Sequence, residues 1–376
     1  MDRMDRIIYA DSQSSADLLY ATRFVAPDPF LYFTARGKSY LALSDLEVDR
    51  GRREARVDRV LHGSRFREEL RKKLGRWPTP EETSLRILRK HGVRRAMVPG
   101  LFPYRMALFL SRGGIKLSVP RDGLFPERVH KNKAEVREIE SALRVTEHLL
   151  ARAREILKSS KAGAGKKLKW AGSVLTSERL RAEIQVLALR MGAVADQPII
   201  AGGVQACDPH DRGSGPLKAC ELIVVDIFPR LQKTCYWGDM TRTFVRGKSS
   251  FAQKKLFETV RLAQERGFDL IGPGVQAEKI HREVTALFEK HGYRTGRLDG
   301  RQQGFIHGTG HGLGLEIHEA PGMGIGSPSR LERGNVVTVE PGLYYPRIGG
   351  VRIEDVVLVT SNGCRKLSRF PVVLEV

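Results

Sequence analysis

Four acidic residues stand in strongly apolar stretches of the sequence. Asp226 lies inside the segment ELIVVDIF, and Asp239 begins the segment DMTRTF. Glu340 ends the apolar run VVTV, and Glu354 lies mid-strand in GGVRIEDVVLV, where a period of two puts Arg352 on the same face. One such acid alone is better explained as a salt-bridged or sheet-edge residue, because an unpaired buried carboxylate costs several kcal/mol or becomes neutral. Four together require a shared positive partner, and a pair of divalent cations would supply it.

Three histidines follow closely in the glycine-rich segment GFIHGTGHGLGLEIHEAPG, at His307, His311 and His318. A lone histidine is commonly a satisfied core or surface residue, but three near glycines are harder to dismiss. The interleaved glycines argue against a helix, and neither H-E-x-x-H nor G-x-G-x-x-G occurs. One imidazole with four carboxylates suits Mn²⁺, Co²⁺ or Fe²⁺, and Zn²⁺ in favourable geometry. Two such ions, about 3.5–4 Å apart, can hold a hydroxide and polarise a carbonyl.

The elements that must position these residues form two regions. Residues 29–44 read as two short strands around a glycine turn, and the later acidic segments read as core strands. We place a boundary near residues 128–132, which gives an N-terminal domain over 1–130 and a catalytic domain over 131–376. Apolar periodicity and capping residues predict helices at 65–75, 81–91, 134–157, 177–191, 250–268 and 275–291.

The chain of 376 residues is strongly basic, with a formal net charge of +21. Residues 50–95 alone hold 16 Lys and Arg against 6 Asp and Glu. Such an excess suits an anionic partner, but no zinc-finger, RNP or basic-zipper signature accompanies it, so we expect no nucleic-acid partner. The N-terminus has no apolar core typical of a secretory signal, and no apolar run is long enough to span a membrane. We therefore expect a cytoplasmic protein without a membrane partner.

The order and spacing of these motifs resemble the pita-bread metallopeptidases, which include methionine aminopeptidase, prolidase, aminopeptidase P and creatinase. The family pattern is D, D-x-T-R-T, G-H-G-x-G, E-P-G and R-x-E, and the chain reproduces it over roughly 130–376. The resemblance implies an α+β chain, with a C-terminal pita-bread domain behind a smaller N-terminal α/β domain of the creatinase type. This N-terminal part resembles the creatinase and prolidase branch much more weakly.

The resemblance also implies roles for individual residues. Asp239 and Glu354 would bridge two metal ions, and Glu340 would act as general base toward the metal-bound water. His210 and His318 would assist catalysis near the leaving nitrogen and the tetrahedral intermediate. His307 and Arg352 would contact or orient the substrate. The implied metal ligands are Asp226, Asp239, His311, Glu340 and Glu354.

The activity implied is hydrolysis of the Xaa-Pro bond at the N-terminus of dipeptides or short peptides, by attack of a metal-bridging hydroxide. Manganese is the first expectation for both ions, with Co²⁺, Fe²⁺ or Zn²⁺ as alternatives. Short proline-containing peptides would be the substrates, and the resemblance implies a homodimer. The alternative is a binding protein for RNA or a protein partner that uses the basic N-terminal surface, although such a protein has no reason to keep five ligands. Dipeptidase and aminopeptidase activities stay open.

Overall fold

The computed structural model describes residues 4–376, which divide into two compact units, one ending at Arg128 and the other beginning at Val129. Within the second unit, the first residues after the division are attached to a later loop. The Asn335 side chain donates to the carbonyl of Val129 at 3.0 Å, and the Lys131 amide donates to the carbonyl of Gly334 at 2.8 Å. These bonds explain why the division falls before Val129. No helix in the described part of the chain has the length and apolar character needed to cross a membrane.

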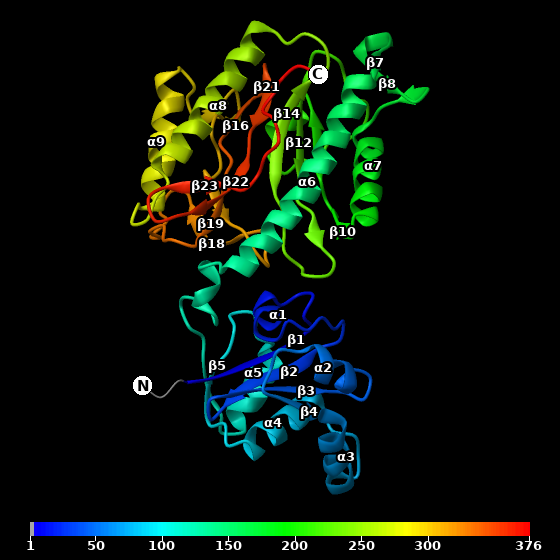
Figure 1. Cartoon of the computed structure of the whole chain (residues 1–376), viewed down its shortest axis with the longest axis vertical. Helices are drawn as coiled ribbons and strands as arrows, with labels where there is room; N and C mark the ends of the chain where they lie inside the picture. The colour runs from blue at the N-terminus through cyan, green and yellow to red at the C-terminus, as the bar shows by residue number, and fades with distance from the viewer. Residues whose placement is uncertain (1–3) are drawn as a thin grey trace. The chain divides into compact units, whose positions relative to one another are not determined.

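The first unit is a six-stranded sheet between two layers of helices (Figure 1). Ile7 and Ile8 are adjacent on β1 and point to opposite faces, as a strand requires. Ile7 packs into the core that includes Ile87, and Ile8 into the core that includes Leu18. The strands, in spatial order, are β4 (Arg59–His62), β3 (Lys38–Leu43), β2 (Phe30–Ala35), β1 (Asp5–Ala10), β5 (Arg95–Met97) and β6 (Lys116–Ser118). The helices are α1 (Ala16–Thr22), α2 (Val48–Glu54), α3 (Gly63–Leu74), α4 (Pro80–Lys90) and α5 (Tyr104–Arg112).

The second unit begins with the long helix α6 (Lys133–Ser159), whose start is fixed by a capping box. The Asn132 side chain accepts from the backbone amides of Ala134 and Glu135, and the Glu135 carboxylate accepts from the Asn132 backbone amide at 3.0 Å. The stripe that the sequence predicted for this helix is buried, at Ile139, Leu143, Val145, Leu149 and Ile156.

Two antiparallel sheets, each covered by a pair of helices, make up the body of this unit (Figure 1). Helices α6 and α7 (Ser177–Arg190) pack on the first sheet, and α8 (Phe251–Leu270) and α9 (Ala277–Lys290) pack behind the second. The first sheet orders β11 (Ile199–Gly202), β12 (Leu222–Ile227) and β14 (Met240–Val245). The second orders β18 (Glu319–Met323), β17 (Gly310–Gly312), β19 (Val336–Val339), β22 (Asp355–Val359) and β23 (Cys364–Lys366).

Shorter ladders complete the unit. Directly after α6 comes a small meander of β7 (Lys161–Ala162), β8 (Leu168–Trp170) and β9 (Ser173–Val174). The remaining pairs are β10 (Ala193–Val194) with β13 (Arg230–Leu231), β15 (Gly296–Leu298) with β16 (Arg301–Gln303), and β20 (Gly342–Tyr345) with β21 (Gly349–Arg352).

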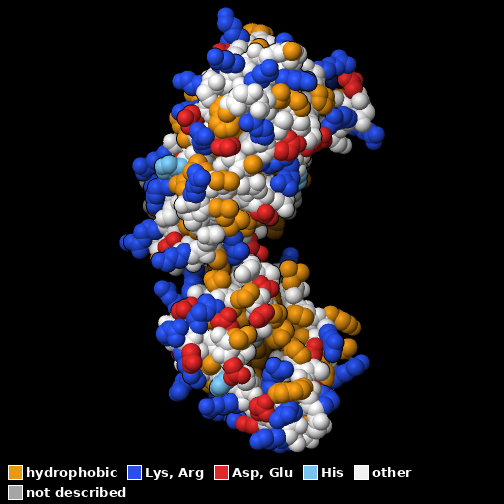
Figure 2. Space-filling model, turned by 90° about the vertical axis from the view of Figure 1, so that its right-hand side faces the viewer, with side chains coloured by type: hydrophobic (Ala, Val, Ile, Leu, Met, Phe, Trp, Pro, Cys, Tyr) orange, Lys and Arg blue, Asp and Glu red, His pale blue; other side chains and the backbone are white. Residues whose placement is uncertain are grey.

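On the face that Figure 2 draws, the basic side chains are dispersed and do not form one patch. Figure 2 shows Lys and Arg spread across the visible face and interleaved with acidic groups. Several arginines of the 50–95 stretch form surface ion pairs, such as Arg50 with Glu54 at 3.2 Å and Arg76 with Glu82 at 2.6 Å. Such exposed pairs contribute little to stability, so this charge is mainly a property of the solvated surface.

Candidate metal centre

Strand register brings the first two acidic residues together. In the ladder between β12 and β14, Asp226 lies opposite Thr241. Asp239 immediately precedes β14 and is two residues before Thr241, so it belongs to the same face as Asp226. All six residues of β12 are buried, which forces Asp226 to face a polar interior site rather than solvent.

Glu354 does not lie within a strand, which corrects the mid-strand placement predicted from sequence. It occupies the two-residue break between β21 and β22. Its amide donates to the carbonyl of Thr241 at 3.1 Å, and the Thr241 hydroxyl donates to its Oε2 at 2.8 Å. The break lets the chain leave one ladder and enter another, while Thr241 holds the carboxylate toward Asp239.

His311 and Glu340 come from the second sheet. Glu340 directly follows β19, as the sequence predicts, and the His311 amide donates to the Thr338 hydroxyl at 3.0 Å. The glycines around His311 are required by close backbone approach. A Cβ at Gly310 would lie 2.1 Å from the Thr338 carbonyl oxygen, and one at Gly312 would lie 2.3 Å from that of Ala320.

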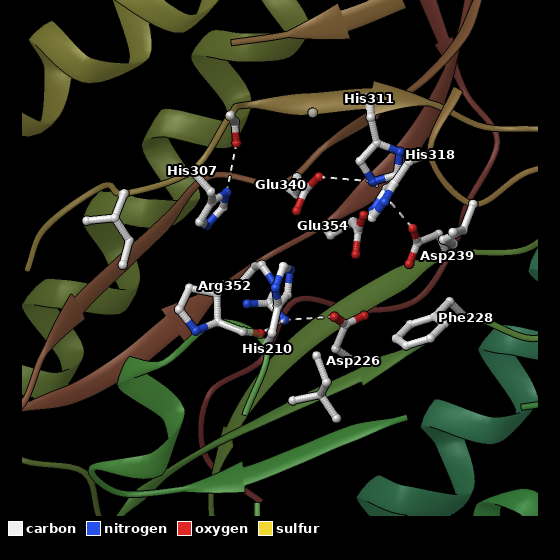
Figure 3. Close-up of a pocket in the computed structure, with 16 residues that line it drawn as sticks. His210, Asp226, Phe228, Asp239, His307, His311, His318, Glu340, Arg352 and Glu354 are labelled. Carbon is white, nitrogen blue, oxygen red and sulfur yellow. Dashed lines mark hydrogen bonds and ion pairs between the residues drawn. The ribbon is translucent and has the colours of Figure 1, made fainter. Parts of the chain in front are cut away.

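The five predicted ligands line one cavity of about 570 Å³ (Figure 3). Ligand atoms of Asp239, His311 and Glu354 all lie within 4.8 Å of one another. His311 Nε2 lies 3.2 Å from Glu340 Oε1 and 3.7 Å from Asp239 Oδ2. The Oδ1 atom of Asp226 is buried without a hydrogen-bond partner, although Oδ2 accepts from Arg352 at 2.7 Å. A buried carboxylate oxygen without a hydrogen-bond donor needs another positive partner, which a bound cation would supply.

The electrostatics of the cluster point the same way. Burial, together with repulsion from Glu354, Asp226 and Glu340, raises the pKa of Asp239 well above its usual range. Burial and repulsion from Glu340 and Asp226 raise the pKa of Glu354 in the same way. Burial also opposes ionisation of Glu340, but the His311 ring, together with His307 and Arg352, outweighs it and lowers the pKa of Glu340 to about 2. The cluster therefore holds more negative charge than the basic side chains beside it neutralise. Its oxygen-rich donor set fits divalent metal ions.

Arg352 is the cationic partner of this cluster. Its guanidinium is buried and donates to Asp226, to the Tyr344 hydroxyl at 2.9 Å and to the Thr241 hydroxyl at 3.2 Å. Arg352 and Glu354 line the same cavity, as predicted, although Glu354 lies in the break between strands; Asp355 faces away and pairs with Arg242. Arg352 therefore fixes the orientation of Asp226.

The other predicted histidines line the same cavity at different depths (Figure 3). The His318 and His311 rings meet edge-to-face with their centroids 4.3 Å apart. Burial and, to a smaller extent, the charge of His311 lower the pKa of His318. His307 Nε2 lies 2.8 Å from the Tyr344 hydroxyl, and burial lowers the pKa of His307 to about 4. His210 is exposed. Its ring lies beside Arg352 in the close-up.

Sequence reasoning missed two residues that organise the cavity. Tyr344 links His307 to Arg352 through its hydroxyl, and burial raises its pKa to about 12, so it stays protonated. The alternation of β20 after Glu340-Pro-Gly could have placed it inward. Lys131 is buried and ion-paired with Glu319, next to His318. Its only sequence signal is its position just before the α6 cap.

The comparisons with known proteins agree with this geometry. The model of metallopeptidase family M24 matches residues 137–361. An Xaa-Pro dipeptidase from Pyrococcus furiosus is 32% identical over 245 residues, and the alignment spans 64% of this chain and 64% of that protein, just under two thirds of its length. The prolidase structure from Pyrococcus horikoshii OT3 matches with a TM-score of 0.79 and 24% identity, covering 99% of this chain and 95% of that one. The X-Pro aminopeptidase structure from Thermotoga maritima matches with a TM-score of 0.81 and 21% identity, covering 99% and 97%.

The structural likeness extends over nearly the whole chain and confirms the expected fold class, a pita-bread domain preceded by a smaller α/β domain. The family match begins just inside α6 and ends just after β22, so it encloses every residue of the metal centre. Because that match covers well over half of the sequence, the chain belongs to metallopeptidase family M24.

Proposed function

We propose that this protein hydrolyses the peptide bond that precedes proline at the N-terminus of short peptides. The observation that carries the proposal is the convergence of three buried carboxylates, the partly buried Glu340 and His311 on one cavity, with an unpartnered oxygen on Asp226. Relatives and structural neighbours named Xaa-Pro dipeptidase, prolidase and X-Pro aminopeptidase support the choice of bond.

Two divalent cations would be held by the five residues Asp226, Asp239, His311, Glu340 and Glu354. Asp239 and Glu354 would both hold the cations, because burial and repulsion from neighbouring carboxylates disfavour their charged forms unless a cation is near. Manganese is the proposed metal, since hard oxygen donors with one imidazole suit it. When bound, the cations would lower the pKa of water and polarise the scissile carbonyl.

The protein's own groups would handle the protons and the substrate. Glu340 is proposed as the general base, because its carboxylate lines the cavity beside His311, where it could accept a proton from the attacking water. His318, beside His311, is proposed to donate to the developing oxyanion. His210, at the exposed end, is proposed to deliver a proton to the leaving nitrogen. Arg352 and His307, joined through Tyr344, are proposed to orient the substrate.

The wider organisation is also proposed. We infer that residues 1–130 act as a separate N-terminal domain, that the protein works as a homodimer and that it is cytoplasmic. Sedimentation of the full chain and fractionation of the source cells check the last two statements. A monomer at micromolar concentration would contradict the dimer.

The function is tested with the full chain loaded with Mn²⁺ or Co²⁺. We expect release of free alanine from Ala-Pro or Ala-Pro-Ala, and none from Ala-Ala-Ala. Asp239→Asn should abolish turnover and metal retention, whereas the control Asp299→Asn, an exposed acid paired with Arg347 at 3.0 Å, should retain both. If the metal-loaded protein cuts neither proline peptide, the proposed function is wrong.

A further inference from the structure

The N-terminal unit contains a cavity of its own, with a volume of about 210 Å³. It lies where β2 begins and β3 ends, and residues of the helices α3 and α4 complete its wall. These elements are labelled in Figure 1. The volume is the liquid volume of about seven water molecules, which leaves room for a small organic molecule. The chemistry proposed for the metal centre uses none of the residues around this cavity.

One side of the cavity is apolar. Leu31 and Ala42 are direct partners in the ladder between β2 and β3, and Ile87 faces them from α4 within the same core. All three line the cavity, and each is less than a tenth exposed. Small-molecule sites typically combine such a hydrophobic wall with a few polar groups that fix the orientation of the ligand.

A buried hydroxyl without a partner lines the same cavity. Ser84 is 3% exposed, and within residues 4–376 its side chain makes no hydrogen bond to another protein group. Serine and threonine in helices commonly bond to a carbonyl of the preceding turn. The neighbouring Thr83 does so, since its hydroxyl donates to the carbonyl of Thr79 at 3.0 Å. Ser84 does not, so its hydroxyl is free to bond to a molecule inside the cavity.

The polar wall of the cavity is positively charged. Gly63 and Ser64 line it and begin α3, and no side chain caps that helix, because the ring of the N-cap residue His62 pairs with Asp45. The first backbone amides of a helix have no partner inside the helix and favour an anion. Arg67, one turn further along α3, lines the cavity as well.

The hydroxyl of Tyr9 connects this positive wall with the sheet. Burial and then the Glu81 carboxylate raise the pKa of Tyr9, whereas the Arg67 guanidinium lowers it, so the charge of Arg67 acts on the hydroxyl. Tyr9 therefore stays protonated and can donate to a ligand. Glu81 does not line the cavity and pairs with Arg105 at 3.1 Å. Among the described residues, the lining includes no acidic side chain, which disfavours a cationic or zwitterionic ligand.

We propose that this cavity binds a small monocarboxylic acid with an apolar body. The carboxylate would lie at the start of α3 beside Arg67, and the free hydroxyl of Ser84 would bond to the ligand from the α4 wall. The apolar body would pack against Leu31, Ala42 and Ile87. An inorganic anion could not use the apolar wall, and an amino acid would bring its ammonium group toward Arg67. This site is separate from the metal centre and does not depend on the proposed peptidase function.

Isothermal titration calorimetry of the Mn²⁺-loaded full chain tests the proposal with four probes. They are 4-methylpentanoate, its neutral isostere 4-methylpentanamide, leucine and inorganic phosphate. We expect a Kd of about 1 mM for 4-methylpentanoate, as is usual for a ligand of about eight heavy atoms. The amide should bind about tenfold more weakly, because the helix N-terminus and Arg67 act on the charge. Leucine and phosphate should also bind at least that much more weakly.

Two substitutions locate the bound acid. Arg67→Gln should weaken 4-methylpentanoate about two- to fivefold, as expected for an exposed charge, and should leave the amide unchanged. The matched control is Arg71→Gln, because Arg71 is also exposed and stacks on Trp77 as Arg67 does, but it does not line the cavity. Ser84→Ala should weaken the acid about two- to tenfold, the scale of one hydrogen bond. A urea midpoint close to that of wild type shows that this variant folds.

Each contrary outcome overturns the proposal. Equal affinity for the acid and the amide would show that no anion site exists, and phosphate binding as tight as that of the acid would show that the apolar wall contributes nothing. If Arg67→Gln and Arg71→Gln bind 4-methylpentanoate equally well, the acid is held elsewhere, such as at the bound metal ions. If the acid binds as expected while Ala-Pro and Ala-Pro-Ala resist hydrolysis, the proposed function fails and this inference stands.

Discussion

Replacing Arg242 with methionine should destabilise the C-terminal unit without removing a metal ligand. Arg242 lies on β14 and is 1% exposed, and its guanidinium donates to Asp355 Oδ1 at 2.8 Å on the face opposite the metal centre. It also donates to the carbonyls of Glu354 at 2.6 Å and Phe370 at 2.7 Å. The arginine therefore ties β14 to the break that carries Glu354, to the start of β22 and to the C-terminal segment at Phe370.

The magnitude follows from burial on both sides of the pair. Asp355 is fully buried, and removing one partner of such a pair typically costs about 3–5 kcal/mol. Lys366 Nζ lies 2.7 Å from Asp355 Oδ2, and Ser368 donates to Oδ1 at 2.6 Å, so the carboxylate keeps some compensation. The orphaned carbonyls oppose this relief, because an unsatisfied buried acceptor costs about 1–3 kcal/mol. We therefore expect a loss of about 3–5 kcal/mol.

Urea unfolding followed by tryptophan fluorescence measures this loss. A Trp77→Phe background leaves Trp170 and Trp237 as reporters of the C-terminal unit. The control is Arg261→Met, a partly exposed arginine paired with Glu258 and Glu265, for which we expect about 0.2–1 kcal/mol.

A double-mutant cycle with Asp355→Asn tests the pairing itself. The two buried groups touch, so their effects should be non-additive by about 0.5–3 kcal/mol. A loss below about 1 kcal/mol for Arg242→Met, or strict additivity with Asp355→Asn, would refute the reasoning.

Three further predictions concern the metal centre and its supports. Asp239→Asn should remove activity yet raise the urea midpoint of the metal-free protein, because burial and repulsion from neighbouring carboxylates disfavour the charged form of Asp239. A lower midpoint than wild type, measured in EDTA, would contradict this. Lys131→Met removes a buried partner of Glu319 and should lower kcat about 10–100-fold, the usual loss when a contact that supports a metal site is removed, while the exposed control Lys133→Met should match wild type. Equal kcat values in the two variants would show that the Lys131–Glu319 pair does not position the site. Burial lowers the pKa of His307 to about 4, so the stability that its neutral ring contributes is present above the unfolded pKa near 6.5 and is lost as the pH falls toward 4. In urea titrations, His307→Gln should therefore lose less stability than wild type between pH 7 and pH 4.5. Equal losses in the two proteins would argue against a buried neutral ring.

Much of the fold could be predicted from local pattern. The apolar stripe and the Asn132 cap predict α6 to within a few residues, because helix periodicity and capping are properties of neighbouring residues. The same holds for the turn of β2 and β3 around Gly37. Strand ends were less predictable where the chain changes partners, and Glu354 falls in such a change.

The residue types of the candidate site were also readable from the sequence. Carboxylates inside apolar segments and histidines among glycines indicate metal chemistry without any coordinates, because burying such charges requires compensation. Tyr344 and Lys131 escaped notice, since a tyrosine in a strand and a lysine before a helix look ordinary. The role of Tyr344 depends on its contact with Arg352, and that of Lys131 on its pairing with the distant Glu319, and no local pattern shows either contact.

The sequence by itself determined the chemistry: an oxygen-rich metal centre, five candidate ligands in order and the elements that carry them. Only the tertiary structure decided which atoms meet, because contacts between strands far apart in the chain depend on register and on the break at Glu354. It also decided that a second cavity shares the wall segment 306–308 with the cavity of the metal centre. A cavity is the space left between packed elements, and its shape has no local signature in the sequence.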